Sequence, residues 1–313
     1  MIARNTVDAF DLDALMPPDI DGDLEGIQSE AGAEFDDVTG VPLHYGDAER
    51  EAEAIRSRVG ILDRSGRWAM LRVSGPGAVD ALNAAGADPE DMAALMALAP
   101  GQGAVLRFGD EEEKEKTLGM AHVQGGGLLL ILPTSVADAV TAAAAAAQAE
   151  GGPEGEIMDL AEQCVLLSLV GPGAGEFLAL TGISGGAPLA WRATRHRSTL
   201  FFSLFFGVNS PTLKAVPSEP HTQKIAHVDR HGVDNHHEAL RLGVMQEAPG
   251  THSVFGFEGR PVVAAHGVEL GGGLVAANLV VDEGIAGQVW VAMTAKGAEP
   301  VGTQALDTVV AAV

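Results

Sequence analysis

The spacing of apolar residues predicts alternating helices and strands from about residue 41 onward. Between Asp47 and Val59, apolar residues recur every three or four positions, acids come early and arginines come late. That pattern is typical of an amphipathic helix aligned with its dipole. Residues 68–74 alternate polar and apolar side chains, as a half-buried strand does. Further strands are expected at 61–65, 103–108, 128–132, 164–170 and within 261–281, and further helices after residue 133 and at 284–293.

A strand–turn–helix pattern occurs twice along the chain. Gly75-Pro76-Gly77-Ala78 follows one predicted strand, and Gly171-Pro172-Gly173-Ala174 follows another 96 positions later. Each turn leads into apolar residues at helical spacing. Two copies are too few for a solenoid, which needs at least three. The pattern therefore predicts an α+β fold that contains two related subdomains.

An acidic segment precedes the predicted domain. Residues 1–40 hold 11 acids and one base, and Pro17-Pro18 breaks any helix there. We expect a flexible acidic arm, either solvated or folding onto a partner. The whole chain has 43 acidic and 19 basic residues, a net charge of −24. This charge argues against a nucleic-acid binder and against docking on anionic lipid, because both need basic residues.

Cys164 is the only cysteine among the 313 residues. No intrachain disulfide can form, which fits a soluble protein of a reducing compartment. The residue lies in an apolar run, so we expect a small buried hydrophobe rather than a nucleophile. No run of 18 apolar residues is present, so no membrane span is expected. The first residues lack signal- and transit-peptide features; we expect a mitochondrial or chloroplast protein if the source is eukaryotic, and a cytoplasmic one otherwise.

Residues 191–250 differ in composition from the rest of the chain. They hold 6 of the 10 histidines and 4 of the 10 phenylalanines, with 7 bases against 5 acids. Histidines and carboxylates crowd residues 227–238, but their spacing matches no defined metal motif, so no metal site is assigned. We interpret the segment as an insertion outside the core, and a translated intron is the hypothesis. Sequencing of the transcript across residues 189–251 tests it, and uniform retention would contradict it.

With that segment set aside, several short stretches resemble a known family. This is the folate-binding superfamily of the glycine-cleavage T-protein, an aminomethyltransferase, and its iron–sulfur-cluster-maturation relatives. The resemblance implies a duplicated α+β folate-binding domain, with a first part at 41–190 and a remainder at 251–313 that is truncated at its C-terminus. The matching stretches are Val41-Pro42-Leu43-His44-Tyr45, Val59–Ser65, Val73–Ala78, Ile157–Leu160 and Gly297–Gly302.

Three turns within these stretches have a structural interpretation. Asp63-Arg64-Ser65 joins two predicted strands, and Asp and Ser side chains bond their own backbone in turns. The two Gly-Pro-Gly-Ala turns lack the lysine of a phosphate-binding loop. We therefore assign all three turns to architecture.

The resemblance implies tetrahydrofolate as the cofactor and three residues close to it. Tyr45, the only tyrosine, stands at the pocket-lining tyrosine of the family, whose ring can stack on a pterin. His122 stands where the transferases carry the acid that methylene transfer needs; it is either a proton relay or a structural histidine. Glu269 is the acid nearest to Gly271-Gly272-Gly273, which stands at the turn whose glutamate holds the pterin in the family. No residue is assigned a catalytic role.

Three functions are consistent with these residues. The first is a folate-binding accessory protein of the iron–sulfur-maturation kind, with iron–sulfur assembly proteins as partners, because the transferase acid is missing. The second is a tetrahydrofolate-dependent aminomethyltransferase of one-carbon metabolism. The third is an inactive chain, truncated or mis-spliced. The sequence stops before the cysteine motif of the maturation relatives would arrive, so a longer transcript that encodes it would favour the first.

Overall fold

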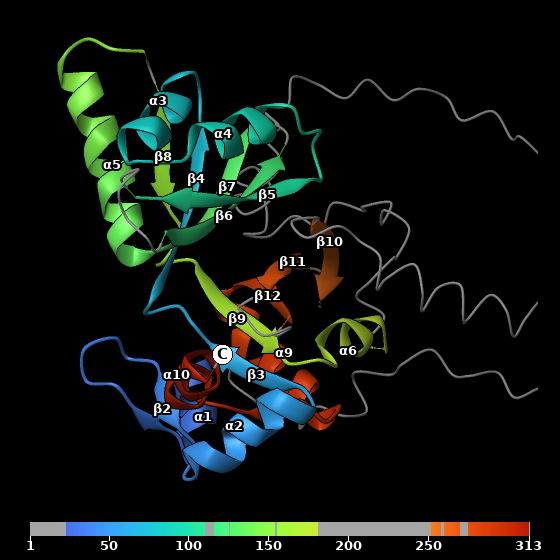
Figure 1. Ribbon diagram of the computed structural model, residues 1–313. Helices are drawn as coiled ribbons and strands as arrows, with labels where there is room; N and C mark the ends of the chain where they lie inside the picture. Colours follow the sequence, from blue (N-terminus) through green and yellow to red (C-terminus); the bar gives the residue numbers. More distant parts are fainter. Residues whose placement is uncertain are drawn as a thin grey trace, which may run out of the picture.

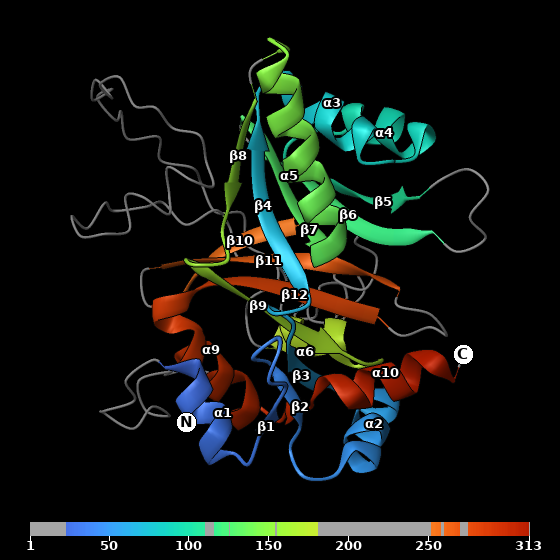
Figure 2. The ribbon, with the colours of Figure 1, turned by 90° about the vertical axis from the view of Figure 1, so that its left-hand side faces the viewer.

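The computed structural model describes residues 23–109, 116–124, 126–153, 155–180, 252–257, 260–269 and 275–312. Two sheets lie one above the other, and helices cover their outer faces (Figure 1, Figure 2). The mixed α+β class expected from the sequence is confirmed. The insertion assigned to residues 191–250 lies outside the described residues, and so do residues 1–22 and the glycine-rich turn at 270–274.

The first sheet has five antiparallel strands in the order β5-β6-β7-β4-β8. On β4, Leu71 and Val73 face the helices whereas Met70 faces the second sheet, which explains the alternation seen in the sequence. The strands are β4 (Trp68–Ser74), β5 (Gly103–Phe108), β6 (Thr117–Gln124), β7 (Gly127–Pro133) and β8 (Glu156–Asp159). The covering helices are α3 (Gly77–Ala84), α4 (Pro89–Met96) and α5 (Thr134–Ala149).

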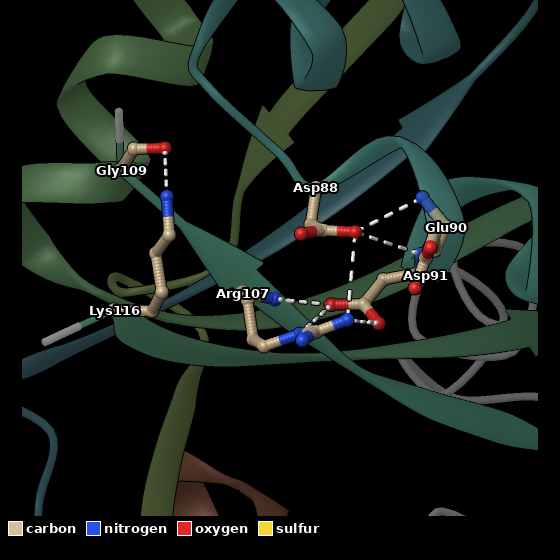
Figure 3. Close-up of polar contacts among 6 residues, drawn as sticks. All are labelled: Asp88, Glu90, Asp91, Arg107, Gly109 and Lys116. Carbon is tan, nitrogen blue, oxygen red and sulfur yellow. Dashed lines mark hydrogen bonds and ion pairs between the residues drawn. The ribbon is translucent and has the colours of Figure 1, made fainter. Parts of the chain in front are cut away.

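One charged contact ties helix α4 to strand β5 (Figure 3). Arg107 donates from Nε and Nη2 to the two carboxylate oxygens of Asp91, at 2.9 and 2.8 Å. This pairing holds the pKa of Asp91 below its ordinary value. Asp88 caps the helix by accepting from the backbone N–H of Glu90 at 2.9 Å. All of these groups have structural partners, so the contact positions the helix and is not a candidate binding site.

The second sheet has six strands in the order β10-β11-β12-β9-β3-β13. Its pairs are antiparallel except β13 with β3, which is parallel. The strands are β3 (Gly60–Asp63), β9 (Cys164–Val170), β10 (His252–Phe257), β11 (Arg260–Glu269), β12 (Val275–Asp282) and β13 (Glu299–Pro300). Its outer face is covered by α1 (Leu24–Glu30), α6 (Ala174–Leu180) and α9 (Glu283–Ala295), on the side opposite α5 (Figure 2).

The inner face of the six-stranded sheet is covered in two parts. Over β9, β11 and β12 it packs against the five-stranded sheet, where the buried side chains include Met70, Met120, Leu166 and Val280. Over β3 and the end of β9 it packs against α2 (Ala48–Ser57) and α10 (Thr303–Ala311). A small hairpin of β1 (Glu34–Phe35) and β2 (Pro42–His44) precedes α2.

The carboxylate of Glu51 joins three separate segments of this region. Glu51 lies on α2 and is buried. Its Oε1 accepts from the backbone N–H of Tyr45 at 2.6 Å, and its Oε2 accepts from the backbone N–H of Gly302 at 2.8 Å. Gly302 is the residue that precedes α10, and a Cβ at that position would overlap the carbonyl of Leu43. Only glycine therefore allows this close approach.

Residues 23–40 differ from the expected flexible arm. Leu24–Glu30 forms a helix whose first N–H groups are capped by Asp23. Leu24 and Ile27 pack into the core under α9, and Gln28 is buried beside them. The expectation was wrong here because the high charge of the segment obscured the spacing of these three residues, whereas its acids remain at the surface.

The two strand–turn–helix units predicted from the repeat are both present. The first is β4 followed by α3 in the five-stranded sheet, and the second is β9 followed by α6 in the six-stranded sheet. Gly171 has a φ of 122° and a Cβ there would overlap the carbonyl of Arg58, so its turn requires glycine. The relation of the units as duplicated subdomains stays a prediction, as do the expected domain boundaries.

Candidate functional site

A row of polar side chains interrupts the apolar layer between the two sheets. Ser168 on β9 pairs in register with Asn278 on β12, and His252 on β10 lies two strands further along the same row. Ser168 and Asn278 are fully or almost fully buried. Strand β6 of the opposite sheet contributes Met120 and His122 to the same layer. Buried polar groups are costly unless they are bonded, so this row is the candidate site.

Asn278 connects the two sheets. The Ser168 hydroxyl donates to Asn278 Oδ1 at 2.7 Å, and Asn278 Nδ2 donates to the Met120 sulfur at 3.2 Å. These two contacts hold the Asn278 amide in one orientation. Because a thioether is only a weak acceptor, the Met120 sulfur competes weakly for the amide N–H groups. Asn278 can therefore offer a donor to a polar group that enters this layer.

Two imidazoles meet at the far end of the row. The His122 and His252 ring centroids are 5.2 Å apart and the rings lie edge to face, at 77°. His122 is fully buried, and burial lowers the pKa of His252. A neutral imidazole carries one donor and one acceptor. The pair can thus bind a polar heterocycle or move a proton, whereas none of the described side chains in the row is a carboxylate.

The burial of His252 predicts a pH-dependent stability. Its pKa is lowered from the ordinary value of 6.5, so the unfolded chain takes up a proton that the folded state excludes. The contribution of His252 is complete above about pH 6.5 and is lost as the pH falls. We expect the free energy of unfolding to decrease less between about pH 7 and about pH 5 in His252→Gln than in the wild type.

Urea denaturation at the two pH values measures this difference. The matched control is His44→Gln, because His44 lies partly exposed on β2 and contacts Glu34. An equal pH dependence in the wild type and in His252→Gln would contradict the prediction.

The structure separates two of the residues that the resemblance assigned to one pocket. Tyr45 lies on the outer face of the six-stranded sheet, where its ring stacks on Trp290 of α9 at a centroid distance of 6.0 Å. Burial raises the pKa of its hydroxyl. His122 lies on β6 of the five-stranded sheet, and its ring packs against the inner face of the six-stranded sheet at His252. Glu269 ends β11, opposite Val275. His122 is thus brought to His252 and not to Tyr45.

Two cavities share Arg64 and Trp68 in their walls, and the inner one adjoins the polar row. The inner one, of about 30 Å³, has room for one or two water molecules and reaches Met120 and Asn278. The outer one, of about 360 Å³, lies against helix α10 and has the size of a small-molecule site. Arg64 and Trp68 therefore stand between the outer cavity and the candidate site.

Sequence reasoning missed several residues of this site. Ser168 and Asn278 each stand as a polar residue inside an apolar strand, and that signal could have identified them. His252 stands directly after the assigned insertion, and no sequence pattern singled it out. Arg64 was assigned to a structural turn. Its neighbours do form such a turn, in which the backbone N–H of Ser65 donates to Asp63 Oδ1.

Other kinds of site were sought in the described ranges. There, no group of three or more His, Cys, Asp or Glu side chains is arranged to hold a metal ion. No helix in these ranges is both long and apolar enough to cross a bilayer. Cys164 is buried and burial raises the pKa of its thiol, so it packs as a small hydrophobe, as expected. The histidine-rich stretch at 227–238 lies outside the described residues.

Comparison with known proteins shows the fold. No family model and no curated protein matches the chain. The structure of the glycine cleavage system aminomethyltransferase T from Bartonella henselae is similar over 91% of this chain, with a TM-score of 0.57 and 18% sequence identity. The chain spans 60% of the length of that structure.

A second solved structure is similar at a lower level. It is the heterotetrameric sarcosine oxidase from Corynebacterium sp. U-96 in complex with pyrrole 2-carboxylate, matched over 81% of this chain and 94% of that chain. The identity is 15% and the TM-score is 0.38, which supports no conclusion. The first likeness confirms the fold that the sequence resemblance implied: this chain has the fold of the glycine-cleavage aminomethyltransferase T.

Proposed function

We propose that the chain is a folate-binding protein that lacks aminomethyl-transfer activity and acts as an accessory protein. The observation that carries this proposal is the environment of His122. This residue stands where the resembling transferases carry an acid, and here it is a fully buried imidazole packed edge to face on His252. An imidazole can hold a heterocycle through its ring nitrogens, but it does not supply the negative charge of a carboxylate.

The described residues fit a pterin by their chemistry. The edge of a pterin carries both donors and acceptors, and His122, His252 and Asn278 offer both kinds of partner. The outer cavity of about 360 Å³ has the size of a small-molecule site, and Arg64 and Trp68 separate it from this row. When bound in a transferase, a reduced folate accepts the one-carbon unit. In this chain the same row would bind and orient the ring once the inner cavity of about 30 Å³ has widened to admit it.

The wider roles rest on the sequence resemblance alone. Support of iron–sulfur cluster assembly, with assembly proteins as partners, is one such role. The alternative function is a tetrahydrofolate-dependent aminomethyltransferase, which is favoured by the fold likeness to a protein of that name. An inactive chain is the third.

Calorimetric titration with 5-formyltetrahydrofolate, a stable reduced folate, tests the proposal. We expect saturable binding and no tetrahydrofolate-dependent release of ammonia from an aminomethyl-lipoyl carrier. Ammonia release would show the transferase instead. Absence of binding at millimolar ligand would remove both folate functions and leave the inactive chain.

A substitution at His122 tests the assigned position of the ligand. We expect His122→Ala to weaken binding of the reduced folate by about tenfold or more, because it removes one hydrogen-bonding group from a dry layer. His44→Ala, on the partly exposed strand β2, is the matched control and should bind as the wild type does. Thermal unfolding by circular dichroism checks that both variants are folded. Equal affinities in the two variants would place the ligand elsewhere.

A further inference from the structure

Arg64 is a buried cation at the turn between β3 and β4. Arg64 is only 5% exposed. The backbone is fixed on both sides: its N–H donates to the Leu166 carbonyl at 2.9 Å, and its carbonyl accepts from the N–H groups of Arg67 and Trp68 at 3.0 Å. The strands therefore set the place of the side chain. Within the described part of the chain, its guanidinium makes no hydrogen bond and no ion pair.

One contact partly compensates this charge. The guanidinium carbon lies 4.0 Å from the centre of the Trp68 ring, a cation–π contact. The free energy gained from such a contact is smaller than the free energy lost when a cation is removed from water. Burial lowers the pKa of Arg64 to about 10, so the group still carries its proton at neutral pH. An anion beside it would supply the missing partner.

The outer cavity has one charge left unbalanced. Arg67 and Asp307 line its wall and pair with each other at 2.8 Å. Arg64 is the remaining charged group of the wall. The rest of the wall is largely apolar and comprises Leu62, Trp68, Thr303, Leu306, Val310 and Ala311.

We propose that the outer cavity binds a small molecule with an apolar or aromatic body and one carboxylate, and that Arg64 pairs with this carboxylate. A planar guanidinium matches the two oxygens of a carboxylate. A polyanion would be repelled by a chain of net charge −24, whereas one negative charge balances the one positive charge of the wall. The apolar body packs against Leu306 and Val310.

This inference does not rest on folate binding. A free arylalkyl carboxylate and the benzoyl-glutamate end of a folate present the same chemistry to the cavity. The experiment must therefore separate these two sources.

Calorimetric titration of the full chain uses four probes. They are 4-phenylbutyrate, its neutral amide, p-aminobenzoyl-glutamate and 5-formyltetrahydrofolate. We expect 4-phenylbutyrate to bind at least about tenfold more tightly than its amide, since only the acid pairs with Arg64. Equal affinity for the acid and the amide, or no binding of the acid at millimolar concentration, would overturn the proposal.

Variants of Arg64 separate a binding role from a structural one. Arg64→Met should lose the preference for the acid over the amide, and Arg64→Lys should retain part of it, since lysine keeps the charge without the planar fork. Arg56→Met, on the exposed side of α2, is the matched control. The thermal unfolding midpoint of Arg64→Met should equal or exceed that of the wild type, because an unpaired buried charge is removed. A lowered midpoint would show that the guanidinium supports the fold, and would overturn the proposal.

The probes also distinguish this inference from the proposed function. Binding of 4-phenylbutyrate without binding of the reduced folate supports the carboxylate site and overturns the folate function. Binding of the reduced folate with the same affinity in the wild type and in Arg64→Met, together with equal affinity for 4-phenylbutyrate and its amide, supports the folate function and overturns the carboxylate site. Binding of both, each weakened in Arg64→Met, supports a folate whose carboxylate pairs with Arg64.

Discussion

Glu51→Ala is expected to lower the free energy of unfolding by about 4 kcal/mol. The substitution removes the acceptor of two backbone donors, the N–H groups of Tyr45 and Gly302. Each buried donor left without a partner costs about 1–3 kcal/mol. The change also disconnects the start of α10 from α2. Urea denaturation followed by far-UV circular dichroism measures the difference.

Two further variants test the cause of this loss. Glu51→Gln keeps one carbonyl oxygen, so about half of the loss is expected. Glu53→Ala changes a glutamate two positions further along the same helix, where the side chain is 65% exposed, and should cost less than about 0.5 kcal/mol. If Glu51→Ala cost no more than Glu53→Ala, the carboxylate would not connect these segments in solution.

Trp290→Ala is expected to lower the free energy of unfolding by a similar amount, about 4 kcal/mol. Trp290 lies buried on α9, in the core between this helix and the outer face of the six-stranded sheet. Its removal leaves a large cavity and takes away the ring on which Tyr45 stacks. Urea denaturation of the purified variant gives the value directly.

The controls for Trp290 separate volume from stacking. Trp290→Phe retains a ring and should cost about 1.5 kcal/mol. Tyr45→Phe should be neutral or stabilising, since the buried Tyr45 hydroxyl makes no hydrogen bond within the described residues. Met96→Ala, at a side chain 62% exposed, should change the free energy by less than about 0.5 kcal/mol. A loss below about 1 kcal/mol in Trp290→Ala would contradict the packing of α9.

The hydrophobic pattern predicted two central strands well, because β4 alternates polar and apolar residues and β9 is an almost continuous apolar run. The predicted strands at 68–74 and 164–170 match β4 and β9 in both bounds. Helix α1 was missed because its acids concealed a short apolar face. Helix α4 was not predicted, although Asp88 followed by Pro89 is a typical helix start.

The candidate site was less predictable, because a sequence pattern does not say which face of a sheet meets which partner. The resemblance placed Tyr45 and His122 in one pocket, yet their rings lie on opposite faces of the six-stranded sheet. His122 and His252 are 130 residues apart, so only the packing of β6 on β10 brings them together. Glu51 looked like one of several acids on a helix, and its two backbone partners are visible only in three dimensions.

The strand order of the two sheets has a consequence for how the chain folds during synthesis. The five-stranded sheet is built from one continuous stretch, 68–159, so it can form soon after that stretch leaves the ribosome. The six-stranded sheet takes strands from residues 60 to 300. Until β13 is synthesised, the free edge of β3 is open to pairing with another nascent chain. The contact between Glu51 and Gly302, which spans 251 residues, closes that edge region only after residue 302 has been synthesised.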